Sequence, residues 1–426
     1  MTASHRTAPH VPVLRLDPTG TDHQGEAARL RELGPVVQVI LPGEVKAWAV
    51  TTHRLVSELV TSPAVSKDWH RWTDLRTGRI PDDWPLTGMV KVTNMVTADG
   101  EDHHRLRRVV TQVLTPARVK AMRPQITALA HRLVRELPRH ADLDGAVDLR
   151  EHLAYPLPMA VICDVIGIPD DHRPQMRHLV QSIFDSTAAP DEVLSTQHLI
   201  YALLDQVVDE RRHTPGTDLV SALISVQNDS PDILSDAELT GTLWLMISAG
   251  HETTLSLITN ALRALLTHPD QLHLALNADT DIWPVIVEET LRWDAPIGNF
   301  LARYPTEDLR IGGVTIPAGD AILAPYSAVG RDTAQHGPTA DRFDLTRRQE
   351  RHLAFGGGPH VCLGAPLARM EAAIALEALL TAYPGLCLAA APESLVPVPS
   401  LISNSVQSLP ARLNRPATTH LQGARS

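Results

Sequence analysis

Apolar positions recur at helical spacing over most of the chain, whereas strict alternation is confined to short stretches. The longest helical pattern opens at a capping box, Ser235-Asp236-Ala237-Glu238, and runs to about Thr267, before Pro269. At 1.5 Å per residue this helix would span roughly 50 Å, about the width of a domain. Because its middle, residues 243–247, is apolar, we expect it to cross the core.

Shorter elements surround this helix. Helical spacing also predicts helices over residues 23–34, 102–113, 116–137, 150–166, 192–212, 269–278, 284–293 and 366–382. Strands are expected at 36–40 and 46–50, joined as a hairpin at Pro42-Gly43, at 311–316 and 321–324, and in a β-rich tail over 400–413. Residues 69–95 are rich in Trp and Pro and predict an ordered loop with a short helix, a plausible lid. The fold class is therefore mainly α with a small β portion.

Composition narrows the class of protein. The chain has 426 residues, 43% hydrophobic and 20% charged, which is typical of globular proteins. No linker divides it, so we expect one domain over 1–426, with 1–20 a loosely ordered N-terminal extension. A net charge of −11 argues against a nucleic-acid partner.

Cys163, Cys362 and Cys387 are too few for a disulfide framework and suit a reducing cytosol. The polar N-terminus has no apolar run for a signal peptide or membrane anchor, so a soluble cytoplasmic protein is expected.

One cysteine lies in a glycine-rich decapeptide, Phe355-Gly356-Gly357-Gly358-Pro359-His360-Val361-Cys362-Leu363-Gly364, directly before the predicted helix 366–382. The N-terminus of a helix offers free N–H groups and the positive end of the helix dipole, and both stabilise a thiolate. The glycines let the backbone lie flat against a large planar ligand. Use of Cys362 as a zinc ligand is a poor alternative, since no C-x-x-C pair accompanies it.

This decapeptide resembles the haem-binding loop of the cytochrome P450 family, F-x-x-G-x-(H/R)-x-C-x-G, and the resemblance covers nearly the whole chain in order. It implies the P450 fold, with haem b between the long central helix and the helix that follows the loop. Cys362 would be the axial iron ligand, whose electron donation favours O–O cleavage. The loop residues implied to contact the haem are Phe355, Gly356, Gly358, His360, Cys362 and Gly364.

The middle of the long helix carries an unusual cluster, Ala249-Gly250-His251-Glu252-Thr253-Thr254. By itself it could be a kink in which threonines bond back to preceding carbonyls. Beside a haem loop it resembles the family's A/G-G-x-D/E-T signature, where the helix opens and Ala249 and Gly250 lie against the cofactor. That resemblance makes Glu252 and Thr253 catalytic: Thr253 donates a hydrogen bond during oxygen activation and Glu252 relays protons. His251 faces elsewhere and is expected to be structural.

Glu289 and Arg292 lie three residues apart on one predicted helix face, a spacing that is common in surface ion pairs. In this position along the chain they resemble the family's E-x-x-R motif. The resemblance implies that Arg342 completes a buried ion cluster with them, which supports the cysteine loop.

His103 and Arg107 lie one helical turn apart, and a solvated basic face would explain them equally well. The resemblance implies instead that both bind haem propionates, together with Arg303 and His360.

Family topology assigns the substrate pocket to four segments, whose residues are equally plausible as plain core. The residues named for it are Trp84, Met95, Leu245, Ala249, Ile297, Asn299, Phe300 and Ile402. Aromatic residues make up only 4% of the chain, so we expect a mostly aliphatic pocket for a bulky apolar scaffold such as a macrolide or steroid of secondary metabolism.

Five arginines flank segments expected on the thiolate side of the haem: Arg105, Arg108, Arg347, Arg348 and Arg351. In an acidic protein this local positive charge predicts a docking surface for an acidic ferredoxin-like electron donor.

The resulting interpretation is a bacterial haem-thiolate monooxygenase that inserts one oxygen atom into a C–H bond, with electrons from a ferredoxin and its reductase. Alternatives are a peroxide-using relative, an enzyme that couples C–C or C–N bonds on an aromatic or peptide-derived substrate, and a non-catalytic haem-binding sensor or recruitment protein. The Glu252-Thr253 pair argues against the first and the last, whereas only product mass separates oxygen insertion from coupling.

Overall fold

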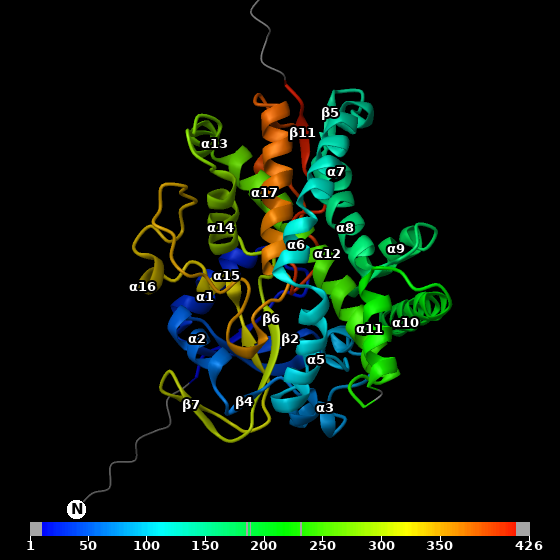
Figure 1. Cartoon of the computed structure of the whole chain (residues 1–426). Helices are drawn as coiled ribbons and strands as arrows, with labels where there is room; N and C mark the ends of the chain where they lie inside the picture. The colour runs from blue at the N-terminus through cyan, green and yellow to red at the C-terminus, as the bar shows by residue number, and fades with distance from the viewer. Residues whose placement is uncertain (1–10, 185, 188, 231, 415–426) are drawn as a thin grey trace, which may run out of the picture.

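The structure is a computed structural model that describes residues 11–184, 186–187, 189–230 and 232–414. Figure 1 shows helices α5 to α11 gathered on one side and the largest sheet with α1 and α2 on the other. The helices are α1 (His23–Leu33), α2 (His53–Thr61), α3 (Thr73–Arg76), α4 (Thr87–Val90), α5 (Gly100–Val113), α6 (Pro116–Ala121), α7 (Arg123–Glu136), α8 (Pro156–Ile166), α9 (Arg173–Ile183), α10 (Pro190–His213), α11 (Leu219–Asp229), α12 (Asp236–Thr267), α13 (Pro269–Leu276), α14 (Trp283–Trp293), α15 (Tyr326–Val329), α16 (Thr333–His336) and α17 (Ala365–Ala382).

Helix α12 is the long helix that the sequence predicted, with the same ends. Ser235 accepts a hydrogen bond from the backbone N–H of Glu238, and the Glu238 side chain accepts one from the backbone of Ser235, so the predicted capping box is confirmed. The helix contacts α8, α10, α14 and α17, and most of its residues are buried. It is therefore the central element on which the other helices pack.

The strands form one large sheet and two small ones. The large sheet has the order β1-β2-β3-β9-β6-β4, and the small sheets are β10-β11-β5 and the β7-β8 hairpin. Their bounds are β1 (Val13–Arg15), β2 (Val36–Leu41), β3 (Val45–Val50), β4 (Val65–Ser66), β5 (Ala146–Asp148), β6 (Phe300–Pro305), β7 (Leu309–Ile311), β8 (Val314–Ile316), β9 (Ile322–Ala324), β10 (Cys387–Leu388) and β11 (Pro410–Arg412). The predicted hairpin of residues 36–40 and 46–50 is confirmed as β2-β3.

Prolines divide two of the predicted helices. The pattern over 116–137 is broken into α6 and α7, because Pro124 is tolerated only in a first helical turn. The pattern over 150–166 begins as a π-helical turn, Arg150–Ala154, and α8 starts at Pro156. The sequence pattern did not predict α2, α9, α11 or β6.

Two β predictions also need correction. The single piece expected over 311–316 is the two-stranded β7-β8 hairpin. The tail over 400–413 contains only the strand β11 and isolated bridges such as Ile297 with Ser403. The tail instead folds over the core with Leu401 and Ile402 buried.

The prediction of a loosely ordered extension over residues 1–20 is wrong for residues 11–20. Residues 1–10 lie outside the described residues, but Val13–Arg15 pairs parallel to β2. In the described ranges, no helix combines the length and apolar character needed to cross a membrane.

Candidate active site

The cysteine loop delivers a sulfur atom to the N-terminus of α17, as predicted. The Cys362 N–H donates to the carbonyl of Phe355 at 2.9 Å and closes the loop. At Gly358, φ is 64° and a Cβ would lie 2.3 Å from the carbonyl oxygen of Val60. Only glycine fits there, so the loop can turn back to present its cysteine.

Cys362 opens into a cavity that reaches α12 and contains most of the predicted haem-contacting residues. Its wall includes His103, Arg107, Ala249, Gly250, Thr253, Arg303, Phe355, Gly356, His360, Cys362 and Gly364. Gly358 lies off this wall and shapes the loop instead. Desolvation raises the pKa of the Cys362 thiol, while hydrogen bonds from the backbone N–H groups of Gly364 and Ala365 oppose that effect.

Positive groups converge on one edge of this cavity. The rings of His103 and His360 lie 4.2 Å apart, and Arg107 Nη2 donates to the carbonyl of Val361 at 2.8 Å. Burial and neighbouring positive groups lower the pKa of His103 to about 4. Arg303 is buried, and the ion pairs among the described residues provide it with no carboxylate. A buried guanidinium without a counter-charge favours an anionic ligand.

Glu252, on α12, is buried and held by partners from distant segments. Its Oε1 accepts from Ser256 Oγ at 3.3 Å, from Ser403 Oγ at 3.3 Å and from Arg150 Nη2 at 3.5 Å. Burial raises the pKa of Glu252, and the positive charge of Arg150 opposes the rise. Sequence reasoning missed Arg150 and Ser403, which lie 102 and 151 residues away along the chain.

Thr253 lies one residue on and faces the cavity. Its Oγ1 donates to the carbonyl of Ala249 at 2.7 Å, which is the back-bonding alternative considered from sequence. The helix stays α-helical here, so the predicted opening is not observed. Gly250 allows α8 to approach, because a Cβ there would lie 2.7 Å from Ile162 Cδ1. His251 is buried elsewhere, edge-on to Tyr155 at 4.6 Å.

A buried ion cluster joins α14 to the segment 330–347, and one member differs from the prediction. Arg292 Nη2 and Nε donate to the two carboxylate oxygens of Glu289 at 2.6 and 2.8 Å. Arg342 contributes only its carbonyl, which accepts from Arg292 at 2.8 Å, and its side chain is exposed because the neighbouring Phe343 takes the buried position. The second arginine is instead Arg347, whose Nε lies 3.5 Å from Glu289 Oε1.

A second cavity adjoins the first on the α12 side, and we call it the substrate-side cavity. Five of the predicted pocket residues line it: Leu245, Ala249, Ile297, Phe300 and Ile402. Met95 lines the cavity of Cys362. Lining residues that sequence reasoning missed include Lys67, Thr97, Phe184 and Trp244. Their segments are far apart in sequence, so no local pattern marked them as neighbours.

Two predicted pocket residues lie elsewhere. Trp84 is buried against Trp72, with ring centroids 5.7 Å apart, and its indole N–H donates to the carbonyl of Pro42 at 2.8 Å. Asn299 donates its amide to the carbonyl of Leu401 at 3.0 Å. Both side chains stabilise the sheet side of the molecule. Residues 69–95 were predicted to hold one short helix, and the structure has two, α3 and α4; the lid role stays a prediction.

The five arginines predicted to form a docking surface fall into two groups, one paired or buried and one exposed. Arg105 Nη2 pairs with Glu238 at 2.6 Å, and the Arg347 side chain is mostly buried in the ion cluster. Arg108, Arg348 and Arg351 are exposed. Only these three are available to an approaching protein.

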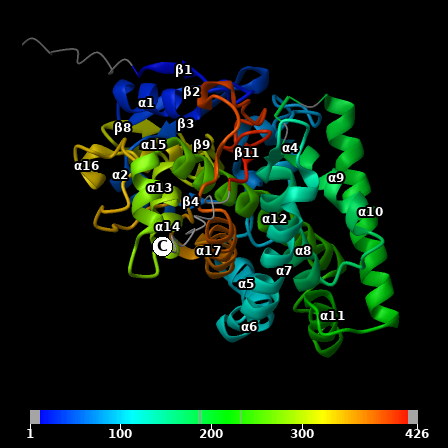
Figure 2. The same ribbon diagram turned by 90° about the horizontal axis from the view of Figure 1, so that it is seen from above.

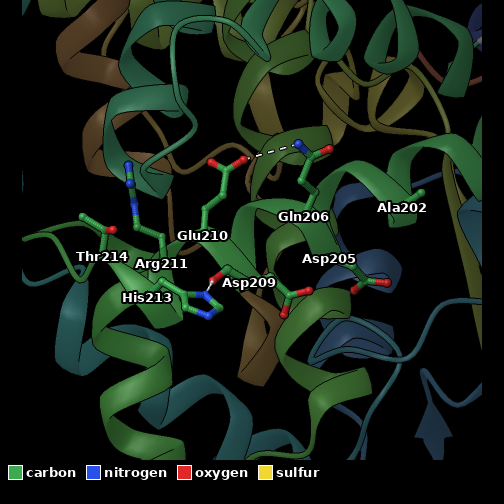
Figure 3. Close-up of a pocket in the computed structure, with 8 residues that line it drawn as sticks. All are labelled: Ala202, Asp205, Gln206, Asp209, Glu210, Arg211, His213 and Thr214. Carbon is green, nitrogen blue, oxygen red and sulfur yellow. Dashed lines mark hydrogen bonds between the residues drawn. The ribbon is translucent and has the colours of Figure 1, made fainter.

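A third hollow lies on α10 and is lined by residues 202–214 alone (Figure 3). Unlike the cavity of Cys362, its described lining includes no cysteine. Gln206 donates to Glu210 at 3.3 Å, and the His213 ring bonds to the carbonyl of Asp209 at 2.7 Å. Figure 2 shows α10 at the edge of the molecule. The hollow is therefore a hydrogen-bonded surface feature.

The comparisons with known proteins agree with this geometry. The profile of the family described as Cytochrome P450 matches residues 58–274 and 282–388. The chain is a cytochrome P450. A 2-hydroxy-5-methyl-1-naphthoate 7-hydroxylase from Streptomyces carzinostaticus is 36% identical over 400 residues, which cover 94% of this P450 and 97% of that protein.

Two further relatives cover almost the whole chain. The 6-deoxyerythronolide B hydroxylase of Saccharopolyspora erythraea is 36% identical over 409 residues, covering 95% of this P450 and 99% of that protein. The solved structure of CYP154C4 from Streptomyces sp. W2061 is 42% identical with a TM-score of 0.92, covering 95% and 99% of the two chains. The predicted fold, monooxygenase class and cysteine-ligated haem cofactor are thereby confirmed. Enzymes of this family act on small molecules and take electrons from a redox partner.

The residues that line the cavity of Cys362 fit a haem. The cavity of Cys362 brings together a cysteine sulfur, the buried Arg303 without a counter-charge and apolar walls from Leu245, Leu257 and Leu367. A planar group with two carboxylates and a metal centre satisfies all three features at once.

Proposed function

We propose that the Cys362 thiolate would hold the haem iron and that this P450 hydroxylates a bulky, apolar small molecule. The observation that carries the proposal is one cavity with Cys362 on one wall and Thr253 on another, continued by the substrate-side cavity. The bound haem supplies dioxygen activation. In the overall reaction a substrate C–H becomes C–OH, the second oxygen atom leaves as water, and two electrons and two protons are consumed.

The proposal gives each polar residue a task. Arg303, with Arg107, His103 and His360, would hold the two propionates. Thr253 Oγ1 donates its single proton to the carbonyl of Ala249 in this structure, and it would turn from that carbonyl to donate toward the space in front of Cys362. Glu252 is the buried acid that passes protons toward that hydroxyl, since a proton on this carboxyl is favoured by burial.

The relatives suggest the class of substrate. Their names denote hydroxylation of a naphthoate and of 6-deoxyerythronolide B, a fused-ring and a macrocyclic scaffold. The substrate-side cavity has mainly apolar walls, which suits a rigid scaffold of that kind. We propose a ring-containing secondary metabolite as the substrate.

Electrons are proposed to come from an acidic ferredoxin in the cytoplasm. We propose that Arg108, Arg348 and Arg351, which are all exposed, form its docking surface on a chain whose net charge is −11. Such a surface accelerates encounter with an acidic partner by electrostatic steering.

The decisive experiment is turnover of the purified holoenzyme with a ferredoxin and its reductase under ¹⁸O₂, using macrolide, steroid and naphthoate panels. A product heavier than its substrate by one ¹⁸O atom supports the proposal. A product lacking two hydrogens with no label would identify oxidative coupling instead. A haem protein that shows the family's reduced carbon monoxide band yet never consumes NAD(P)H would be a sensor rather than an enzyme.

A further inference from the structure

Lys67 is a buried cation on the wall of the substrate-side cavity. It follows β4, and its side chain is only 4% exposed. Its Nζ donates to the carbonyl oxygens of Ala302 at 2.9 Å and Leu301 at 3.4 Å, and it lies 4.6 Å from the ring centroid of Phe300. Lysine is rarely buried without a partner charge, so this position needs a reason.

No carboxylate forms an ion pair with Lys67 among the described residues. Asp99 is already engaged, because it accepts from the backbone N–H of Lys67, from the hydroxyl of Ser66 and from His360. Burial lowers the pKa of Lys67 well below its usual value, and the positive charge of Arg303 lowers it further. A carboxylate against Nζ would supply the missing charge.

The surroundings of Lys67 in the cavity are apolar. Its wall includes Val90, Phe184, Trp244 and Ile402, and Lys67 is the one charged side chain among the described residues that line it. A ligand that fills this space therefore meets hydrophobic walls and a single cation. An apolar molecule with one acidic group matches that arrangement.

We propose that Lys67 binds a carboxylate carried by an otherwise apolar substrate. The inference rests on the proposed function and narrows its substrate to an acid. An ammonium group has three N–H donors, and the carbonyls of Leu301 and Ala302 occupy two of them. The third donor is left for the substrate, and the ion pair would orient the molecule within the substrate-side cavity.

A haem propionate is the competing source of the same chemistry. Lys67 is close enough to His360 for its charge to lower the pKa of that ring. However, Arg303 and His360 line the cavity of Cys362, whereas Lys67 lines only the substrate-side cavity. We therefore assign Lys67 to the substrate and use haem retention to separate the two sources.

The test is an optical titration of the holoenzyme with matched acids and esters: 1-naphthoic acid against methyl 1-naphthoate, and dodecanoic acid against methyl dodecanoate. We expect each acid to bind at least tenfold more tightly than its ester. The Lys67→Met variant should lose that preference while its affinity for the esters stays within twofold of the native value. Lys67→Arg should keep it, and Lys46→Met, which removes an exposed lysine on β3, should change neither.

Two results would overturn the proposal. One is equal binding of acids and esters by the native enzyme, which needs no variant to observe. The other is an unchanged preference in Lys67→Met together with faster transfer of haem to apomyoglobin, which would assign Lys67 to a propionate. The reduced carbon monoxide band of each preparation reports haem-thiolate ligation separately, so a failure of the wider functional proposal would be recognised as such.

Discussion

Arg150 donates a hydrogen bond to Glu252 across 3.5 Å and holds the buried acid of α12 from the π-helical turn before α8. The Glu252 side chain is 4% exposed and that of Arg150 is 11% exposed, so the pair lies between the protein interior and the surface. Arg150, Ser256 and Ser403 all donate to the same carboxylate oxygen of Glu252. The pair therefore sets the ionisation of the group proposed to relay protons.

Replacement of Arg150 by Met is expected to move the acidic limb of the pH profile of product formation to higher pH. Arg150 opposes the effect of burial, so its loss raises the pKa of Glu252 further, and a relay needs the carboxylate form for part of each cycle. Product per NAD(P)H consumed is the measurement. Arg173→Met, which breaks a partly exposed ion pair between α9 and Asp164 of α8, is the control. An unmoved acidic limb would remove Arg150 from the relay.

Replacement of Thr253 by Ala should leave oxygen consumption intact but divert it to hydrogen peroxide. Product per NAD(P)H should fall steeply, because proton transfer by a positioned side chain contributes roughly 10²–10⁴-fold to a rate. Thr259→Ala is the matched control, because Thr259 makes the same bond to the carbonyl four residues earlier and is buried away from both cavities. Equal coupling in the two variants would contradict a role for Thr253.

Replacement of Cys362 by Ser should abolish the reduced carbon monoxide band and monooxygenase turnover, because a hydroxyl cannot supply thiolate ligation. Helical circular dichroism should remain native, since the loop is closed by backbone atoms. Cys387→Ser, at an exposed cysteine beside Asn414, should change neither signal. Full turnover by the Cys362 variant would refute the assignment.

Arg292 and Arg342 should differ sharply when replaced. Arg292→Leu leaves the buried Glu289 with only the more distant Arg347 and is expected to cost about 3–5 kcal/mol of folding free energy and much of the haem content. Arg342→Ala removes an exposed side chain whose carbonyl still accepts from Arg292, so the change should stay within about 0.5 kcal/mol. Denaturant unfolding and haem content measure both. If Arg342→Ala lowered the folding free energy and haem content as much as Arg292→Leu, Arg342 and not Arg347 would be the second arginine of the ion cluster, as the sequence predicted.

Charge reversal at Arg108 and Arg348 is expected to slow reduction by ferredoxin at least tenfold at low salt, with a weaker dependence of the rate on ionic strength. Stopped-flow reduction of the haem protein is the measurement. Arg310→Glu, at an exposed position of the β7-β8 hairpin, applies the same change of charge as a control. Identical rates and salt dependences in all three proteins would exclude this surface as the docking site.

Local patterns predicted the parts of the site that are themselves local. The decapeptide around Cys362 and the capping box at Ser235 each depend on neighbours within ten residues, and both are observed. The E-x-x-R pair likewise meets within one helical turn. Sequence spacing is enough for such features because helix and turn geometry converts it directly into distance.

Features that depend on tertiary packing were mispredicted or missed. Whether Arg342 or Arg347 reaches Glu289 depends on which side chain the loop turns inward, and both lie within one short basic segment. Asn299 lies two residues after Ile297, which lines the substrate-side cavity. Its side-chain amide nevertheless points to the tail and donates to the carbonyl of Leu401. The sequence around Lys67 contains no pattern that predicts its burial. Only the folded chain shows that β6 covers it.

The tail that crosses the core places two consecutive residues in different roles. Ile402 lines the substrate-side cavity, and Ser403 donates to Glu252. Because the two share a peptide bond, the shape of the pocket cannot be altered at this point without disturbing a neighbour of the acid. Divergence toward new substrates, whether natural or engineered, is therefore constrained here by catalysis, and the freer positions for remodelling are those of α4 and Phe184.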